Sequence, residues 1–264
     1  MKRRDLILAS AGLVLPSLGR GAQPCPPPLV GAAGGSSATT DCPTVPTPPP
    51  DPTGTSISTN FPATENPISE GGRWINGKSV GLGWNNVRTS PGKAHAAQFV
   101  GLSGNRYDDC LAHLNTSFTP NQYAQGTVHR VAGYRNSTDK HEIELLLRFR
   151  ITANSARGYE VLWGQDGEIW VVRWNGPLGN YTAFEASALP NSDANKAVDG
   201  DVLRAEISGN IITVKRNGLT VVRQDVTALG GTTWTDGQPG VGFWPTAGST
   251  LDAYGWKNYQ AGSL

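Results

Sequence analysis

The strongest constraint on the fold is an alternation of apolar and charged side chains within residues 141–151, which from Glu142 onward only Leu146 interrupts. Successive side chains of a β-strand point to opposite faces of its sheet, so this run predicts a strand with one buried and one polar face. The apolar side consists of Ile143, Leu145, Leu147, Phe149 and Ile151, and the polar side of Glu142, Glu144, Arg148 and Arg150.

Shorter runs of the same kind fill residues 58–264 and are separated by turn residues. Asp166-Gly167, Gly209-Asn210 and Asn217-Gly218 are dipeptides that favour tight turns between paired strands. No convincing helical period longer than two turns accompanies these runs. The sequence therefore predicts an all-β domain of about ten or more strands, arranged as a two-sheet antiparallel β-sandwich.

Composition changes along the chain, because the positions before residue 58 are rich in proline and small polar residues. We divide the chain into an export signal (1–22), a disordered Pro/Gly/Ser/Thr-rich linker (23–57) and one jelly-roll domain (58–264). Lys2-Arg3-Arg4 followed by an apolar run is typical of an export signal, by either the general secretory or the twin-arginine route. The run is too short to be a transmembrane segment. We therefore expect a bacterial protein that is periplasmic or extracellular.

Charge and cysteine content narrow the partners and the compartment. The formal net charge of +1 gives no electrostatic reason to expect nucleic acid as a partner. Cys25 and Cys42 flank part of the linker and could form a disulfide outside the cytoplasm. Cys110 lies between polar and apolar residues, so we expect a buried structural thiol and not a nucleophile. We expect a monomer that requires no cofactor.

Three stretches of the predicted domain resemble segments of a known family, in addition to showing the strand pattern. Residues 199–214 with the Asn217-Gly218 turn, the closing run 237–243 and the opening run 61–74 resemble the strands of concanavalin A-like jelly rolls, including laminin-G-like domains. The resemblance implies a sandwich whose concave sheet carries a ligand groove. It leaves the activity open, because this fold serves lectins, adhesion domains, glycoside hydrolases and polysaccharide lyases.

Two glutamates of the alternating run are candidates for catalysis. Glu142 and Glu144 would lie on one strand face, roughly 6–7 Å apart. Carboxylates at that distance could share general acid and base work, one of them with a raised pKa. Laminarinase-type hydrolases of the family that this sequence resembles carry a Glu-x-Asp-x-x-Glu strand motif. Here three leucines follow Glu144, so the later acid is missing. The alternative is a solvated strand face on which both carboxylates pair with Arg148 and Arg150.

A second set of candidates points to polysaccharide elimination. If residues 122–130 form a strand, then Tyr123, Gln125 and His129 share one of its faces. A uronate lyase must neutralise the sugar carboxylate, for which Gln125 and Arg148 are suited, and needs a base and an acid, which His129 or a tyrosine could supply. Jelly-roll alginate lyases use a similar Gln-x-His strand, although the spacing differs here. The alternative is an ordinary polar strand.

Aromatic side chains supply the candidates for sugar contact. Trp170 and Trp174 share one face of a predicted strand, and either they line a groove or their face is the core face. With Trp163, Tyr123 and Arg150 they form the predicted substrate-binding set. A sugar ring would stack on such indole or phenol rings.

Asp199 and Asp201 are weak candidates as oxygen ligands of a structural calcium ion, although no EF-hand spacing is present. The sequence as a whole favours an exported carbohydrate-active jelly roll that recognises a polysaccharide in the groove of its concave sheet. Two alternatives stay open. One is a polysaccharide-degrading enzyme, with a lyase on a uronate-containing polymer ahead of a glycoside hydrolase. The other is an adhesion or structural surface module.

Overall fold

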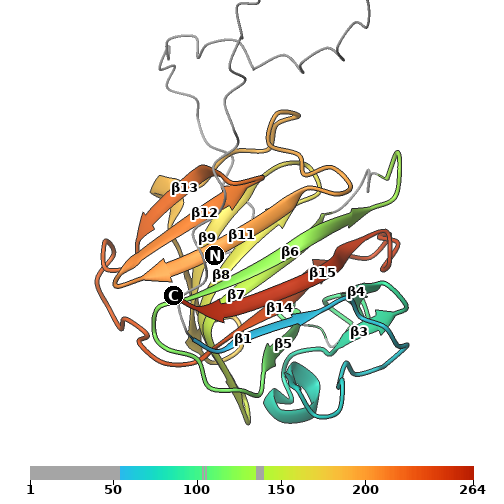
Figure 1. Ribbon diagram of the computed structural model, residues 1–264, viewed down its shortest axis with the longest axis horizontal. Coiled ribbons are helices and arrows are strands. Elements are labelled where there is room, and N and C mark those ends of the chain that lie inside the picture. Colours follow the sequence, from blue (N-terminus) through green and yellow to red (C-terminus); the bar gives the residue numbers. More distant parts are fainter. Residues whose placement is uncertain (1–53, 103, 105, 135–139) are drawn as a thin grey trace, which may run out of the picture. The chain divides into compact units, whose positions relative to one another are not determined.

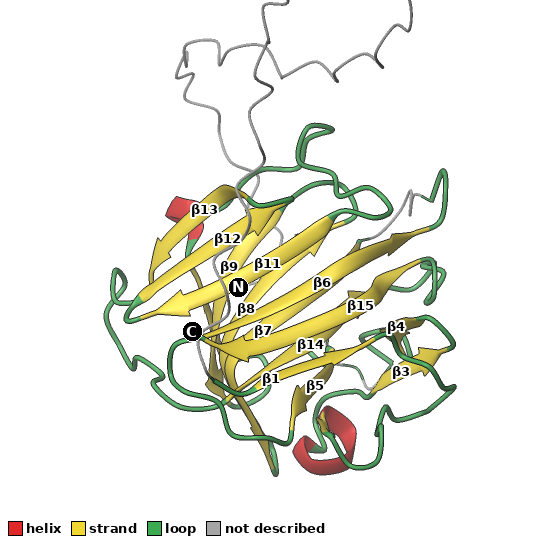
Figure 2. Cartoon of the chain, viewed as in Figure 1, coloured by secondary structure: helices red, strands yellow, loops and turns green. Residues whose placement is uncertain are grey.

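The computed structural model describes residues 54–264 except 103, 105 and 135–139 (Figure 1). In this part of the chain strands dominate, and the helical turns are η1 (Gly77–Gly81) and η2 (Glu185–Ser187) (Figure 2). The predicted export signal, the linker up to residue 53, and Cys25 and Cys42 lie outside the described residues. None of the described helices has the length and apolar character needed to span a bilayer.

One sheet has eight strands, in the order β13-β12-β11-β6-β15-β4-β3, with β1 also paired to β15. These strands are β1 (Ser56–Thr59), β3 (Val87–Ser90), β4 (Lys93–Ala96), β6 (Gln122–Arg130), β11 (Val202–Ser208), β12 (Ile211–Arg216), β13 (Leu219–Asp225) and β15 (Tyr254–Ser263). The pairing of β1 with β15 brings together the two ends of the described chain, with Ser56 opposite Gly262. The folded region thus includes residues 54–57, which the sequence analysis placed in the linker.

The other sheet has seven strands, in the order β10-β9-β8-β7-β14-β5-β2. These are β2 (Trp74–Asn76), β5 (Cys110–Leu114), β7 (His141–Thr152), β8 (Ser155–Gly164), β9 (Ile169–Gly176), β10 (Tyr181–Ala183) and β14 (Gln238–Pro245). Neighbouring strands run antiparallel throughout both sheets. The predicted two-sheet sandwich is confirmed, as are the hairpins β8–β9, β11–β12 and β12–β13.

The main core lies between the sheets and is built from one alternate set of side chains in each central strand. It includes Ile143, Leu145, Trp163, Tyr254 and Trp256, all less than 3% exposed. Cys110 belongs to this core, and burial raises the pKa of its thiol to about 12. The prediction that Cys110 is a buried structural thiol is confirmed.

A second apolar layer covers the outer face of the seven-stranded sheet. It consists of Trp84, Leu111, Leu146, Phe149, Ile151, Ala156, Leu162, Val172 and Trp174. The layer corrects one sequence prediction, because Phe149 and Ile151 lie here and not with Ile143 in the main core. The cause is a register shift between Leu147 and Arg150, where Arg148 has a φ of 46°. Such a bulge reverses the faces to which the following side chains point.

Candidate functional site

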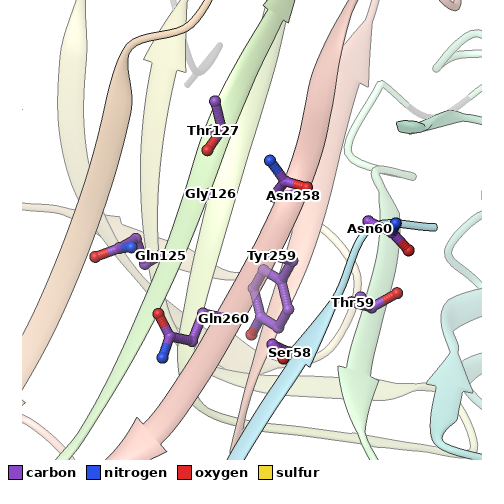
Figure 3. A pocket seen from close by; sticks show the side chains of 9 residues that line it. All are labelled: Ser58, Thr59, Asn60, Gln125, Gly126, Thr127, Asn258, Tyr259 and Gln260. Carbon is purple, nitrogen blue, oxygen red and sulfur yellow. The ribbon is translucent and has the colours of Figure 1, made fainter. Parts of the chain in front are cut away.

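A polar groove lies on the outer face of the eight-stranded sheet, where β1, β6 and β15 run side by side (Figure 3). Its volume is about 430 Å³. The lining residues are Ser58, Thr59, Asn60, Gln125, Gly126, Thr127, Asn258, Tyr259 and Gln260.

The groove exists because β15 changes its neighbour along its length. From Tyr259 onward β15 pairs with β1, whereas at Trp256 it pairs with β4. β15 also shifts register against β6 between Trp256 and Asn258. Beyond the end of β1 at Thr59, the sheet therefore has a gap beside Asn258.

The floor of the groove depends on a glycine. A Cβ atom at Gly126 would lie 2.3 Å from Cε3 of Trp256, whose ring is buried in the main core beneath the groove. Any other residue at position 126 would push that ring out of place. The floor is therefore backbone, and the polar side chains stand around it.

The chemistry of the lining is uniform, since its polar side chains carry hydroxyl or amide groups and none is charged. Five of them make no side-chain hydrogen bond to another described residue: Ser58, Asn60, Thr127, Asn258 and Gln260. Amides both donate and accept hydrogen bonds, as do hydroxyls. The groove thus offers unused donors and acceptors to an uncharged, hydroxyl-rich ligand.

A charged cluster adjoins the groove on the same face. Arg204 Nε and Lys215 Nζ lie 2.6 and 2.8 Å from the two carboxylate oxygens of Glu206. The Arg204 guanidinium lies 3.6 Å from the ring centroid of Tyr123, and Nη1 donates to Gln125 Oε1 at 3.4 Å. Burial acts to raise the pKa of Glu206, but the hydrogen bonds from Lys215 and Arg204 outweigh it and lower that pKa. Tyr123, predicted to contact sugar, is buried beneath Arg204.

Gln125 and His129 share one face of β6, as the sequence predicted, but only Gln125 lines the groove. His129 lies near the end of the strand with its side chain 20% exposed, and its Nδ1 is 3.9 Å from Asp199 Oδ1. Burial and the nearby Lys93 lower the pKa of His129, against the opposing effect of Asp199. His129 is therefore largely neutral at neutral pH.

Glu142 and Glu144 lie on the opposite side of the sandwich, on the outer face of the seven-stranded sheet. Both are fully buried, as are Glu160 and Asp109. Carboxylate oxygens of Asp109, Glu144 and Glu160 lie within 4.8 Å of one another, a geometry that could hold a metal ion. The expected solvated or groove-lining position of Glu142 and Glu144 is wrong, because the second apolar layer covers this face.

Arg148 also lies elsewhere than predicted. Its side chain is buried, and Nε, Nη1 and Nη2 donate to the carbonyl oxygens of Pro120, Trp234 and Gly209 at 2.7, 2.9 and 2.8 Å. The guanidinium thus joins three loops and faces no groove. Arg150 follows the bulge, is exposed and pairs with Asp236 at 3.2 Å.

The predicted tryptophan platform is mostly interior. Trp163 lies in the main core and donates to Asn195 O at 3.1 Å, whereas Trp174 lies in the second layer. Trp170 is half-buried against that layer. The face of Trp174 is packed, but the alternative that made it the core face is wrong, because Ile169 and Val171 on the other face of β9 lie in the main core.

The candidate calcium ligands are occupied by protein groups. Asp199 accepts hydrogen bonds from the Arg130 amide and from Lys257 Nζ. Asp201 accepts from Arg216 Nε and Asn217 Nδ2. Both carboxylates therefore serve to hold neighbouring loops and strands together.

The candidates that sequence patterns joined into one groove are thus divided among three places. Gln125 lies in the groove, Glu142 and Glu144 lie beneath the second layer, and Arg148 lies inside the loops. The sequence analysis missed Ser58, Asn258 and Gln260. No local signal marks them, because Ser58 meets Gln260 only through the pairing of β1 with β15, two strands about 200 residues apart in the sequence.

Comparisons with known proteins find only remote similarity to solved structures. No protein-family model matches the chain, and no curated protein matches it. The carbohydrate-binding module CBM66 from Bacillus subtilis is 10% identical with a TM-score of 0.45, covering 74% of this chain and 95% of that one. The β-porphyranase BpGH16B from Bacteroides plebeius is 11% identical with a TM-score of 0.40, covering 78% and 92%.

Sheep galectin-11 is 9% identical with a TM-score of 0.39, covering 55% of this chain and 92% of that one. At these identities and TM-scores the likeness assigns no role to any residue.

Proposed function

We propose that this protein is an exported carbohydrate-binding protein that holds a segment of polysaccharide in the polar groove of its eight-stranded sheet. One observation carries the proposal: five uncharged hydroxyl and amide side chains around the groove have no hydrogen-bond partner among the described residues. Sugar hydroxyls can satisfy both the donors and the acceptors of such groups. The export signal predicted for residues 1–22 would bring the protein to polysaccharides outside the cytoplasm.

The groove supports binding rather than hydrolysis. Glycoside hydrolysis needs two carboxyl groups that flank the scissile bond. None of the groove-lining residues is acidic, and Glu142 and Glu144 are sealed under an apolar layer on the other sheet. A polymer could reach those two carboxylates only if that layer were displaced.

Retention on a panel of immobilised polysaccharides tests the proposal. The panel holds xylan, β-glucan, alginate, polygalacturonate and chondroitin sulfate. The double variant Asn258→Ala/Gln260→Ala should bind the retained polymers at least ~10-fold more weakly, about 1.4 kcal/mol for two lost hydrogen bonds. Its melting temperature should stay unchanged, because neither side chain makes a hydrogen bond within the described chain.

Thr152→Ala is the matched control, since Thr152 is an exposed polar residue at the end of β7, in the other sheet and outside the groove. It should bind like the unaltered protein. The proposal is overturned if no polymer is retained, or if the double variant binds as well as the control. New ultraviolet absorbance typical of unsaturated uronates, lost in His129→Ala, would instead establish the lyase alternative.

A further inference from the structure

A line of polar side chains leads out of the groove across the strands, on the outer face of the eight-stranded sheet. Directly paired residues lie on the same face, so the strand registers place its members side by side. From β1 to β12 they are Ser58, Gln260, Gln125, Arg204 and Lys215. We call these five residues the cross-strand row.

The row changes in chemical character along its length. Ser58, Gln260 and Gln125 line the groove and are uncharged, whereas Arg204 and Lys215 carry positive charge. Four strand spacings of about 4.8 Å make the row about 19 Å long. A chain-like ligand lying across the strands would therefore meet hydroxyl and amide groups first and cations at the end.

The charged end keeps an excess of positive charge. Arg204 and Lys215 share one carboxylate, that of Glu206, so two cations face a single anion. The side chains of Arg204 and Lys215 are 20% and 30% exposed, so an incoming group can reach both. Their charges are close enough to act on one ligand group.

Arg204 is also held in place for such a contact. Its guanidinium is stacked over Tyr123, Nε donates a hydrogen bond to Glu206, and Nη1 donates one to Gln125. Nη2 makes no hydrogen bond to a described residue. An arginine fixed in this way loses little entropy when it binds an oxyanion, and a charge-assisted hydrogen bond is stronger than a neutral one.

We infer that the polysaccharide lies along the cross-strand row and carries an acidic group, a carboxylate or a sulfate, that binds to Arg204 and Lys215. The inference rests on the proposed function and narrows its substrate class to acidic polysaccharides. The uncharged groove then holds sugar hydroxyls, and the cationic end selects for the acidic substituent.

Polygalacturonate and its fully methyl-esterified form are the matched probes for the carboxylate, and chondroitin sulfate is the probe for the sulfate. Lys215→Gln removes one charge while keeping a polar side chain, and it should weaken binding to an acidic probe at least ~3-fold. Binding to the methyl ester should not change. The acidic probes should also lose affinity as salt rises, because salt screens exposed charges.

Lys78→Gln in η1 is the control, since it removes one exposed charge away from the row. It should bind every probe like the unaltered protein. Arg204→Gln is measured beside it, with a thermal melt to exclude loss of folding.

The outcomes separate the inference from the proposed function. If Asn258→Ala/Gln260→Ala loses binding but Lys215→Gln and a folded Arg204→Gln do not, the inference of an acidic substituent is wrong and the proposed function stands. Retention of neutral polymers alone leads to the same conclusion. If the groove double variant binds normally, the proposed function itself is wrong.

Discussion

The indole N–H of Trp174 donates to Oε2 of Glu160 at 2.6 Å, and neither side chain is exposed to solvent. Trp174 also contacts the ring of Trp84 edge-on, with 6.1 Å between ring centroids. The outer face of the seven-stranded sheet is therefore covered in this region, and buried carboxylates and indoles pack against one another there. Stability, and not ligand binding, should respond to changes made there.

Trp174→Phe should lower the free energy of unfolding by about 1.5–3 kcal/mol, because it removes a hydrogen bond to a buried carboxylate and leaves much of the apolar volume. Urea denaturation measures this change. Retention on the polysaccharide panel should be unaltered. An unchanged denaturation midpoint would show that the indole N–H contributes little.

Arg148→Ala should destabilise the domain by about 3 kcal/mol or more, because three carbonyl oxygens in separate loops lose their donor. Arg148→Lys should recover only part of that loss, since a single ammonium cannot replace a planar fork of donors. Thermal melts compare the variants. Binding per folded molecule should stay normal in both, and a specific loss of binding would return Arg148 to the ligand site.

Gly126→Ala should weaken both folding and binding, because its Cβ would lie 2.3 Å from the buried Trp256 ring. Overpacking of this kind costs about 1–3 kcal/mol. Melting temperature and panel retention test it together. Gly92→Ala is a contrasting variant, since a Cβ there meets no atom within 4 Å and only its positive φ of 83° opposes the change.

The domain should lose stability on mild acidification through a buried histidine. Burial lowers the pKa of His113 to about 4, against an ordinary value of 6.5. The unfolded chain takes up a proton near pH 6.5, whereas the folded protein does so only near pH 4, so stability is complete above this window and falls as pH decreases through it. The loss reaches about 3 kcal/mol.

Melting temperatures recorded between pH 7 and pH 4 measure this effect. His113→Gln should melt lower at pH 7, because Nδ1 donates to Leu114 O and Nε2 accepts from the Ile151 amide. Its melting temperature should depend less steeply on pH than that of the unaltered protein. An equal slope would assign the pH dependence to other groups, among them His141, whose pKa burial lowers to about 3.

Deletion of residues 23–53 should leave the melting temperature within a few degrees of the full mature chain, because their composition offers little apolar surface to bury. Deletion of residues 23–59 should lower it clearly, since β1 covers an edge of β15 and buries part of Ile57. It should also abolish retention on the panel, because Ser58 and Thr59 line the groove. Comparable melting of the two deletion variants would show that β1 adds no stability.

Local patterns predicted the parts of the fold that local physics controls. The Asp166-Gly167 and Asn217-Gly218 turns and the alternation around Ile143 identified hairpins and strands. The bulge at Arg148 carries no comparable signal, because its conformation is set by hydrogen bonds to loops distant in sequence.

The site was harder to predict than the fold. Gln125 was identified as a candidate and lies in the groove, but its role was tied to Glu144 and Arg148, from which the structure separates it. Alternation shows which residues share a face of one strand. It does not show which outer face takes part in binding, nor that a second apolar layer seals the other.

The antiparallel pairing of β1 with β15 has a consequence for engineering. Because Ser56 lies opposite Gly262, a short glycine bridge could join Leu264 to Gly54 without disturbing either sheet. New ends opened at the exposed Asn217-Gly218 turn would keep every strand pair. Such a circular permutant would carry its termini beside the cationic end of the cross-strand row, where a reporter or a second module could be attached.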